Sequence, residues 1–222
     1  MELNHLLAFE LGISTIRQLP WQTDQRRALS ECAAILEDID GETVNRQLLE
    51  VATRQQRHQI DRSFVRPSHN KWYLGGEPAS VMIWAHEYAD ELPPDQLGSF
   101  AASTHNHRYG FASRIINGSI TSTTFRSTLS GDGGLIPCSH LARGAGETYV
   151  MTSDEVHRID RVAPSTITLV IQGLPVAETS SVYNRESRAF LQVDGNKDRR
   201  VSEADRQSAH NRYRKKLQGL AT

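Results

Sequence analysis

The 222-residue chain carries 25 lysine and arginine residues against 26 aspartate and glutamate residues, which gives a net charge of -1. This balance gives no electrostatic reason to expect a nucleic acid or an anionic membrane as partner. Cys32 and Cys138 lie far apart and outside any C-x-x-C arrangement, so the sequence indicates neither a disulfide framework nor a zinc ribbon. No apolar run approaches a membrane span and the N-terminus is acidic where a signal peptide is basic, so we expect a cytoplasmic protein.

Residues 1–62 are predicted to form a helical N-terminal segment. Asp24 can cap a helix that continues to about Leu36, and apolar residues recur at helical spacing from Thr43 to about Ile60. The dipeptide Asp40-Gly41 separates these two patterns. We expect the helices to cover one face of a sheet.

From residue 63 to residue 182 the pattern changes to short β-rich runs broken by turns. Strands are predicted at residues 71–74, 80–85, 105–111, 119–125, 146–151, 155–162 and 165–174. No helical pattern separates them, which favours a mainly β fold with an antiparallel, nearly closed barrel. A barrel of this size can hold one small ligand.

Residues 183–222 form a charged C-terminal segment, with a helix predicted at 203–217. Its basic residues are too few to indicate a nucleic-acid site. The stretch 194–205 resembles a calcium loop of the EF-hand kind, although Arg199 replaces the glycine of the sharp turn. A plain capped turn before a helix is the alternative. The oxygen ligands of the calcium loop would be Asp194, Asn196, Asp198, Ser202 and Asp205.

Three histidines are candidate metal ligands. His105 and His107 lie two residues apart in a predicted strand, so both imidazoles point to the same face. His157 follows a second strand-like run and can supply a third nitrogen. The alternative is that an H-x-H pair arises incidentally among nine histidines. The pair His86-Glu87 lacks the second histidine of H-E-x-x-H, which excludes a zinc protease motif.

Residues 98–162 resemble the two motifs of the cupin superfamily. The first motif is matched by Gly98, His105, His107 and Gly118, and the second by Gly146 and His157. Phe111 stands where the family has a glutamate ligand, and Thr152 and Asp154 replace its usual proline and glycine. The resemblance implies a cupin-type antiparallel β-barrel (jelly roll) in which these histidines hold a metal.

Without the glutamate, the ligand set resembles that of the thiol dioxygenases, such as cysteine dioxygenase, which hold ferrous iron with three histidines. Similar segments occur in order over residues 66–176, among them SVMIWA, IINGSI and TLVIQGLP. The resemblance implies an Fe(II)-dependent dioxygenase. Three neutral ligands would leave the metal its full charge, so the expected substrate is a small, anionic metabolite that chelates it. Another divalent metal is the alternative.

The substrate-binding residues implied by this resemblance differ from those of cysteine dioxygenase. That family holds the substrate carboxylate with an arginine on an early strand, where this chain offers Arg66 or Lys71. Val170 and Gln172 replace its late-strand histidine and tyrosine, which argues against cysteine as substrate. Arg114 is interpreted as a surface charge, with a substrate anchor as the alternative. Three aromatic residues either line the pocket or belong to the core: Tyr109, Phe111 and Tyr149.

The predicted function is therefore oxidation of a small molecule by dioxygen, in a monomer or homodimer. Two other functions stay open. In a metal-dependent cupin isomerase or lyase, the metal would serve only as a Lewis acid. In a ligand-binding cupin, the barrel would bind a small molecule without turnover.

Overall fold

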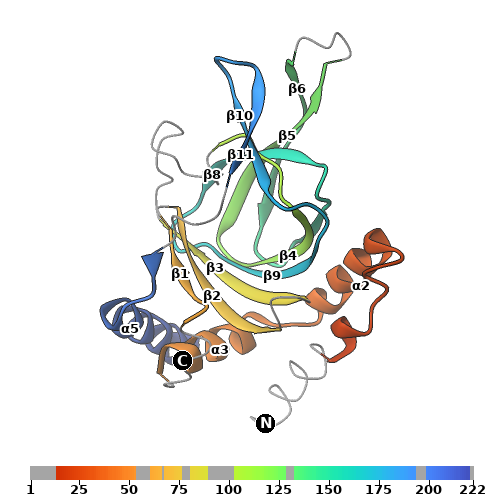
Figure 1. Ribbon diagram of the computed structural model, residues 1–222. Coiled ribbons are helices and arrows are strands. Elements are labelled where there is room, and N and C mark those ends of the chain that lie inside the picture. The colour runs from red at the N-terminus through yellow and green to blue at the C-terminus, as the bar shows by residue number, and fades with distance from the viewer. Residues whose placement is uncertain are drawn as a thin grey trace.

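The computed structural model of the chain describes residues 14–53, 61–66, 68–76, 81–89, 103–128, 133–193 and 199–220. Helices lie at both ends of the described chain, and strands lie between them (Figure 1). The helices are α2 (Gln25–Glu37), α3 (Gly41–Thr53) and α5 (Glu203–Leu220). The strands are β1 (Phe64–Val65), β2 (His69–Gly76), β3 (Met82–Tyr88), β4 (Tyr109–Asn117), β5 (Ser119–Ser127), β6 (Leu135–Gly144), β7 (Thr148–Met151), β8 (Val156–Val162), β9 (Ile167–Pro175), β10 (Ser180–Asn184), β11 (Ala189–Val193) and β12 (Arg199–Arg200).

The strands form two main antiparallel sheets that curl around one interior (Figure 1). The first sheet has the order β12-β1-β2-β3-β9-β4-β7, and the second has the order β6-β5-β8. The β10-β11 hairpin joins the second sheet through His105, which bridges His157 of β8 on one side and Val182 of β10 on the other. The predicted mainly β fold, with antiparallel sheets, N-terminal helices and a C-terminal helix, is confirmed.

The first sheet is buried on both faces because helices cover its outer side. In β9, Ile167, Leu169 and Ile171 belong to the core shared with the helices. Val170, between them, belongs to a second cluster with Tyr73, Trp84 and Phe111 inside the barrel. Successive residues of a strand point to opposite faces, so this alternation assigns each residue of the sheet to the helices or to the barrel interior.

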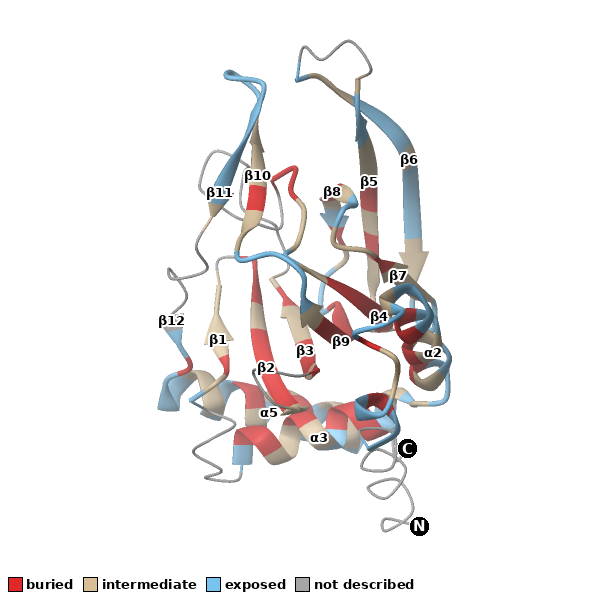
Figure 2. Cartoon of the chain, turned by 45° about the vertical axis from the view of Figure 1, so that its right-hand side comes forward, coloured by how far each residue is buried: buried red, intermediate tan, exposed pale blue. Residues whose placement is uncertain are grey.

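Helices α2 and α3 begin where the sequence predicts, and each is capped by an aspartate. Asp24 caps α2 by accepting a hydrogen bond from the Arg27 backbone N–H (3.0 Å), and Asp40 accepts one from the Thr43 backbone N–H (2.7 Å) ahead of α3. Each cap satisfies a backbone donor that the helix leaves unpaired. Helix α2 packs on β4 and β7, and α3 packs on β2 and α5 (Figure 2). Residues 54–60 of the helix predicted from Thr43 to about Ile60 lie outside the described chain.

Helix α5 is attached to the outer face of the first sheet by a charged pair. Arg212 Nε and Nη2 donate to the two carboxylate oxygens of Glu87 on β3, at 2.7 and 2.9 Å. Trp72 Nε1 donates to the same carboxylate (3.1 Å). Burial opposes ionisation of Glu87, but the hydrogen bond and charge of Arg212 outweigh it and lower the pKa of that carboxyl. Glu87 therefore belongs to the sheet–helix contact and not to the barrel interior.

The sequence did not predict five of the strands: β1, β6, β10, β11 and β12. β6 contains Pro137, follows a glycine-rich stretch, and is largely exposed in Figure 2, as is β11. Such a strand has no buried face to impose an alternating pattern. It forms because β5 pairs with it along nine residue positions, from Ser119↔Gly144 to Ser127↔Leu135.

The end of the candidate calcium loop caps α5. Asp205 Oδ2 accepts hydrogen bonds from the Ser202 backbone N–H (2.8 Å) and hydroxyl (2.6 Å), which is a capping-box arrangement. Asp194, Asn196 and Asp198 lie outside the described residues, so calcium binding stays a prediction. The segment boundaries predicted after residues 62 and 182 also stay predictions.

Gly118, at the turn between β4 and β5, is expected to tolerate no side chain. Its φ is 76°, and a Cβ would lie 2.2 Å from Thr166 Oγ1 and 2.9 Å from Thr166 Cα. We expect Gly118→Ala to lower the free energy of unfolding by about 3 kcal/mol, from backbone strain and overpacking together. Chemical denaturation measures it.

Gly146 provides a matched control for this prediction. It also has a positive φ, 89°, but an added Cβ would meet nothing within 4 Å. Gly146→Ala should therefore lower the free energy of unfolding by about 1 kcal/mol, from backbone strain alone. Equal losses in the two variants would show that the contact with Thr166 is unimportant.

Candidate metal centre

His105 and His157 are placed side by side by their backbones. The His105 backbone N–H donates to the His157 carbonyl, and the His157 N–H donates to the His105 carbonyl, both at 2.8 Å. Residues that exchange both hydrogen bonds in an antiparallel pair project their side chains to the same face. The two imidazoles therefore point together into the barrel, although 52 positions separate them in the sequence.

Asn106 holds the ligand-bearing segment from its other edge. Its backbone N–H donates to the Ser181 carbonyl (3.0 Å), and its side-chain Oδ1 accepts from the Ser181 N–H (2.8 Å). This clamp fixes residues 103–106 between β8 and β10. No role was predicted for Asn106 from the sequence. Asn106 lies between two candidate ligands, and in an extended segment its side chain points to the opposite face. This position could have indicated that it helps to position the ligands.

The three imidazoles converge through their Nε2 atoms. His107 Nε2 lies 3.2 Å from His105 Nε2 and 3.0 Å from His157 Nε2, and all candidate ligand atoms lie within 4.8 Å of one another. Metal–imidazole bonds are about 2.1 Å long, so two ligand nitrogens at right angles around one ion are about 3.0 Å apart. The geometry therefore fits one transition-metal ion. We call these three residues the three-histidine centre.

A backbone contact fixes the tautomer of His105. Its Nδ1 lies 2.8 Å from the Ser103 carbonyl oxygen, which can only accept a hydrogen bond. Nδ1 must therefore carry the proton, and Nε2 directs a lone pair toward the other two imidazoles. Orientation of a ligand imidazole by a hydrogen bond from its other nitrogen is the usual arrangement in metal sites.

Burial keeps the three-histidine centre uncharged. His105 is 1% exposed and His157 is 5% exposed. Removal from water disfavours the charged imidazolium and lowers the pKa of His105 to about 4, and it lowers the pKa of His107 and His157 well below the ordinary 6.5. At neutral pH all three therefore offer lone pairs without first losing a proton.

Phe111 occupies the position of the glutamate that the cupin pattern places after the second histidine. Its ring stands perpendicular to the ring of His107, with centroids 5.1 Å apart, and packs against Tyr149 at 6.1 Å. Among the described residues, the group that could hold a metal contains histidines only. The apolar ring thus covers one side of His107 where a charged ligand would otherwise bind.

Lys71 and Gln172 lie on the same inner face of the first sheet. Lys71, which is 6% exposed, donates from Nζ to Gln172 Oε1 at 3.4 Å. The Lys71 Nζ also lies 4.2 Å from the ring centroid of Trp84 and 6.0 Å from that of Tyr109. Its charge lowers the pKa of His107, after the larger effects of burial and of the other two ligands. The ammonium group therefore lies within electrostatic range of the three-histidine centre.

Arg66 lies on the same side of the barrel, in the turn from β1 to β2. Its backbone N–H donates to the His69 carbonyl (3.0 Å). Burial is the main cause that lowers the pKa of His105, and the charge of Arg66 contributes to it. The structure thus brings Arg66, Lys71, Tyr109, Phe111, Tyr149 and Gln172 to the barrel interior; their roles toward a substrate stay predictions.

Arg114 has a structural contact that the sequence did not reveal. Its guanidinium donates to the Leu36 carbonyl (2.8 Å) and to the Glu37 carbonyl, at the C-terminal end of α2. Cations at this end of a helix satisfy its unpaired carbonyls. Arg114 therefore fastens α2 to the outer face of β4 and lies on the side opposite the three-histidine centre.

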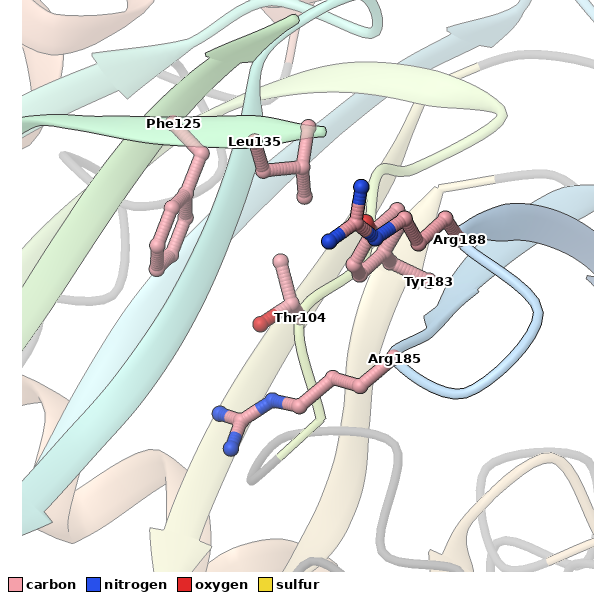
Figure 3. Close-up of a pocket in the computed structure, with 6 residues that line it drawn as sticks. All are labelled: Thr104, Phe125, Leu135, Tyr183, Arg185 and Arg188. Carbon is pink, nitrogen blue, oxygen red and sulfur yellow. The ribbon is translucent and has the colours of Figure 1, made fainter. Parts of the chain in front are cut away.

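A cavity of about 270 Å³ lies elsewhere on the molecule (Figure 3). Thr104 contributes to its lining, and adjacent residues of an extended segment point to opposite faces. The cavity is therefore on the outer side of the segment whose His105 points inward, and it is not part of the three-histidine centre. Figure 3 shows its lining residues: Thr104, Phe125, Leu135, Tyr183, Arg185 and Arg188.

A carboxylate introduced at position 111 is expected to act as a fourth ligand. Phe111→Glu should raise the affinity for Co(II) by about 10-fold, because a negative oxygen ligand would be added beside three neutral nitrogens. Calorimetric titration of the metal-free protein measures it. Phe111→Gln, which has the same shape without the charge, is the control. Equal affinities for the two variants would show that position 111 does not reach the ion.

No family model matches the sequence, and a search of curated proteins finds no similar sequence. Solved structures that align with this chain include an RmlC-like cupin from Shewanella frigidimarina NCIMB 400, with 16% identity and a TM-score of 0.36 over 51% of this chain and 82% of that one. They also include oxalate decarboxylase from Bacillus subtilis (10% identity, TM-score 0.37, 60% and 30% coverage) and the 11S globulin from Wrightia tinctoria (8%, 0.38, 55% and 29%).

These alignments are partial and distant. The matched region spans less than a third of the oxalate decarboxylase and globulin chains. At such identities the chemistry of those proteins says nothing about the reaction of this chain. In the described part of the chain, no helix is both long and apolar enough to cross a membrane.

Proposed function

We propose that this protein is a non-haem Fe(II)-dependent dioxygenase of the three-histidine, thiol dioxygenase-like type, acting on a small anionic metabolite. The observation that supports this most strongly is the convergence of three uncharged imidazoles in a buried interior, with an apolar phenylalanine in place of a carboxylate ligand. Imidazole suits ferrous iron, and three ligands leave positions open for a substrate.

The charge of the interior supports an anionic substrate. A divalent ion held by neutral imidazoles keeps its full charge, and the buried Lys71 contributes another positive charge. Among the described residues, the fully buried set contains no aspartate or glutamate, and the largely buried Glu87 lies on the outer face of the sheet, paired with Arg212. An anion that enters this interior would therefore gain attraction from both sources and meet no opposing carboxylate.

The residues of the chain would divide the work as follows. His105, His107 and His157 would hold iron, whose chemistry when bound is the activation of dioxygen toward a substrate that donates the electrons. Lys71, oriented by Gln172 over the Trp84 ring, would attract and orient the anionic group of the substrate. Phe111 and Tyr109 would exclude water beside His107, to which both rings are close.

Oxygen consumption tests the proposal. The metal-free protein is loaded with Fe(II) without air, and dioxygen uptake is followed after addition of small thiol-carboxylates or enolisable keto acids. We expect uptake with at least one such compound, and loss of that uptake when Zn(II) replaces Fe(II). Metal binding with no oxygen uptake for any of these compounds would count against a dioxygenase.

A Lewis-acid enzyme is the second candidate, because the same uncharged nitrogen set also suits zinc and nickel. The same compounds incubated with the Zn(II)-loaded protein in the absence of oxygen distinguish this candidate. Anaerobic conversion of the substrate would support an isomerase or lyase. Binding without conversion under either condition would indicate a ligand-binding protein.

A further inference from the structure

A second pair of histidines lies inside the barrel and takes no part in the three-histidine centre. His69 on β2 and His86 on β3 have ring centroids 4.7 Å apart. The strand register pairs His69 with Tyr88 and Lys71 with His86, so all four side chains project to the same inner face of the sheet. No short sequence pattern connects His69 with His86, which is why sequence reasoning missed the pair.

Both imidazoles have a nitrogen that lacks a hydrogen-bond partner. His69 is 8% exposed, and its Nδ1 contacts Ser68 Oγ at 2.9 Å. The Nε2 atoms of His69 and His86 are buried, with no partner among the described residues, and so is Nε1 of Trp84 on the same face. Leaving a buried polar atom unpaired destabilises the folded protein, so each such atom calls for an explanation, of which a bound ion or ligand is one.

The surroundings of this pair are cationic. Lys71 is the cross-strand neighbour of His86, and its Nζ lies over the ring of Trp84. Arg66 is joined to His69 through the backbone. After the larger effect of burial, the charges of Arg66 and Lys71 lower the pKa of both imidazoles, which places the two cations within electrostatic range of them. An oxyanion is the group that this arrangement of donors and cations suits.

The pair is also close to the three-histidine centre. His69 is affected electrostatically by His105, and His86 by His107. Both groups of histidines project into the same interior, the first from β2 and β3 and the second from β8 and residues 105–107. The two groups of histidines therefore face one common interior space.

We propose that His69 and His86 form a second subsite, which binds an oxyanionic group of a ligand whose other end reaches the three-histidine centre. This rests on the proposed function and narrows its substrate to a small dianion of the dicarboxylate class. The Ser68 hydroxyl can donate to His69 Nδ1, which leaves the Nε2 proton available to an oxygen of the ligand. Two negative groups also match the positive charges of the ion, Lys71 and Arg66.

Carboxylates of increasing length test the subsite. Acetate, malonate, succinate and glutarate are titrated into the Co(II)-loaded protein, and binding is followed by calorimetry and by the cobalt absorption spectrum. We expect at least one dicarboxylate to bind about 10-fold or more tightly than acetate, because engaging one end raises the effective concentration of the other. Dicarboxylates that bind no more tightly than acetate would overturn the subsite.

Two variants separate the subsite from the metal centre. His86→Phe should reduce dicarboxylate affinity to the level of acetate, leave acetate and Co(II) affinity unchanged, and raise the melting temperature of the ligand-free protein, because an unpaired polar atom is removed. His86→Gln keeps a hydrogen-bonding group and serves as a second test if the phenylalanine variant does not fold. It should retain part of the preference for dicarboxylates over acetate. His140→Gln, at an exposed position on β6, is the control.

The outcomes distinguish the two proposals. If the protein binds no Co(II), the three-histidine centre is wrong. If Co(II) binds and His86→Phe retains the full preference for dicarboxylates, the metal centre stands and the assignment of the second subsite to His69 and His86 fails.

Discussion

Replacing His157 with alanine is expected to lower the affinity of the protein for a divalent metal more than about 100-fold, because even changes that only disturb a ligand's orientation cost 10–100-fold. The variant removes one of three converging nitrogens. The barrel should remain folded, since the two hydrogen bonds that pair residues 105 and 157 involve only backbone atoms. Metal analysis after dialysis against Co(II) or Fe(II) measures the loss.

His140→Ala is the matched control for this variant. His140 lies on the exposed strand β6, and its Nδ1 contacts Thr123 Oγ1 (2.9 Å) on the outside of the barrel. Its removal should leave the metal content unchanged, while His105→Ala should reproduce the loss seen with His157→Ala. Full metal retention in both ligand variants would reject the three-histidine centre.

The metal-free protein is expected to lose stability as the pH falls below about 6.5. The pKa of His105 is lowered from 6.5 to about 4, mainly by burial, so the unfolded chain binds more protons than the folded chain between these values. Stability is therefore greatest above about pH 6.5 and falls as the pH drops toward 4. His105 alone contributes on the order of 3 kcal/mol. Burial lowers the pKa of four more histidines in the same direction: His69, His86, His107 and His157.

Urea denaturation at a series of pH values, kept above the ordinary range of carboxyl groups, measures this effect. The free energy of unfolding should fall with decreasing pH in the metal-free protein. The double variant His69→Phe/His86→Phe should show a shallower fall, because two of the buried imidazoles are gone, and His140→Gln should retain the full slope. A curve that stays flat below pH 6.5 would show that these imidazoles are solvated in the folded protein.

The three-histidine centre could be predicted because part of it is local. His105 and His107 follow the two-residue period of a strand, and this alone indicates that both imidazoles can bind the same metal ion. His157 was predicted to be the third ligand from its spacing within a family resemblance. In the structure its Nε2 lies 3.0 Å from His107 Nε2. Strand β8, which carries His157, was predicted because it has a buried face and an alternating pattern. The strand predicted at 105–111 begins only at Tyr109, so His105 lies in an isolated bridge and His107 lies outside any strand.

What the sequence did not reveal depends on pairing between distant residues. β6 forms because β5 offers a partner, and neither of its faces is buried consistently. Lys71 meets Gln172 across 101 positions, and His69 meets His86 only through the register of β2 and β3. Arg114 was interpreted as a surface charge because its carbonyl partners at the end of α2 lie 77 and 78 positions away.

An ion bound at the three-histidine centre would link two parts of the chain that are distant in sequence, in addition to the backbone pairing of residues 105 and 157. His107 and His157 are 50 positions apart, and they enclose the whole β4-β5-β6-β7 portion of the chain. An ion shared by these two side chains would close that stretch into a loop in the folded protein, and because it binds the folded chain in preference to the unfolded one, it would stabilise the barrel. Metal supply and barrel assembly would then be coupled, so that cells short of the metal would accumulate a less stable protein.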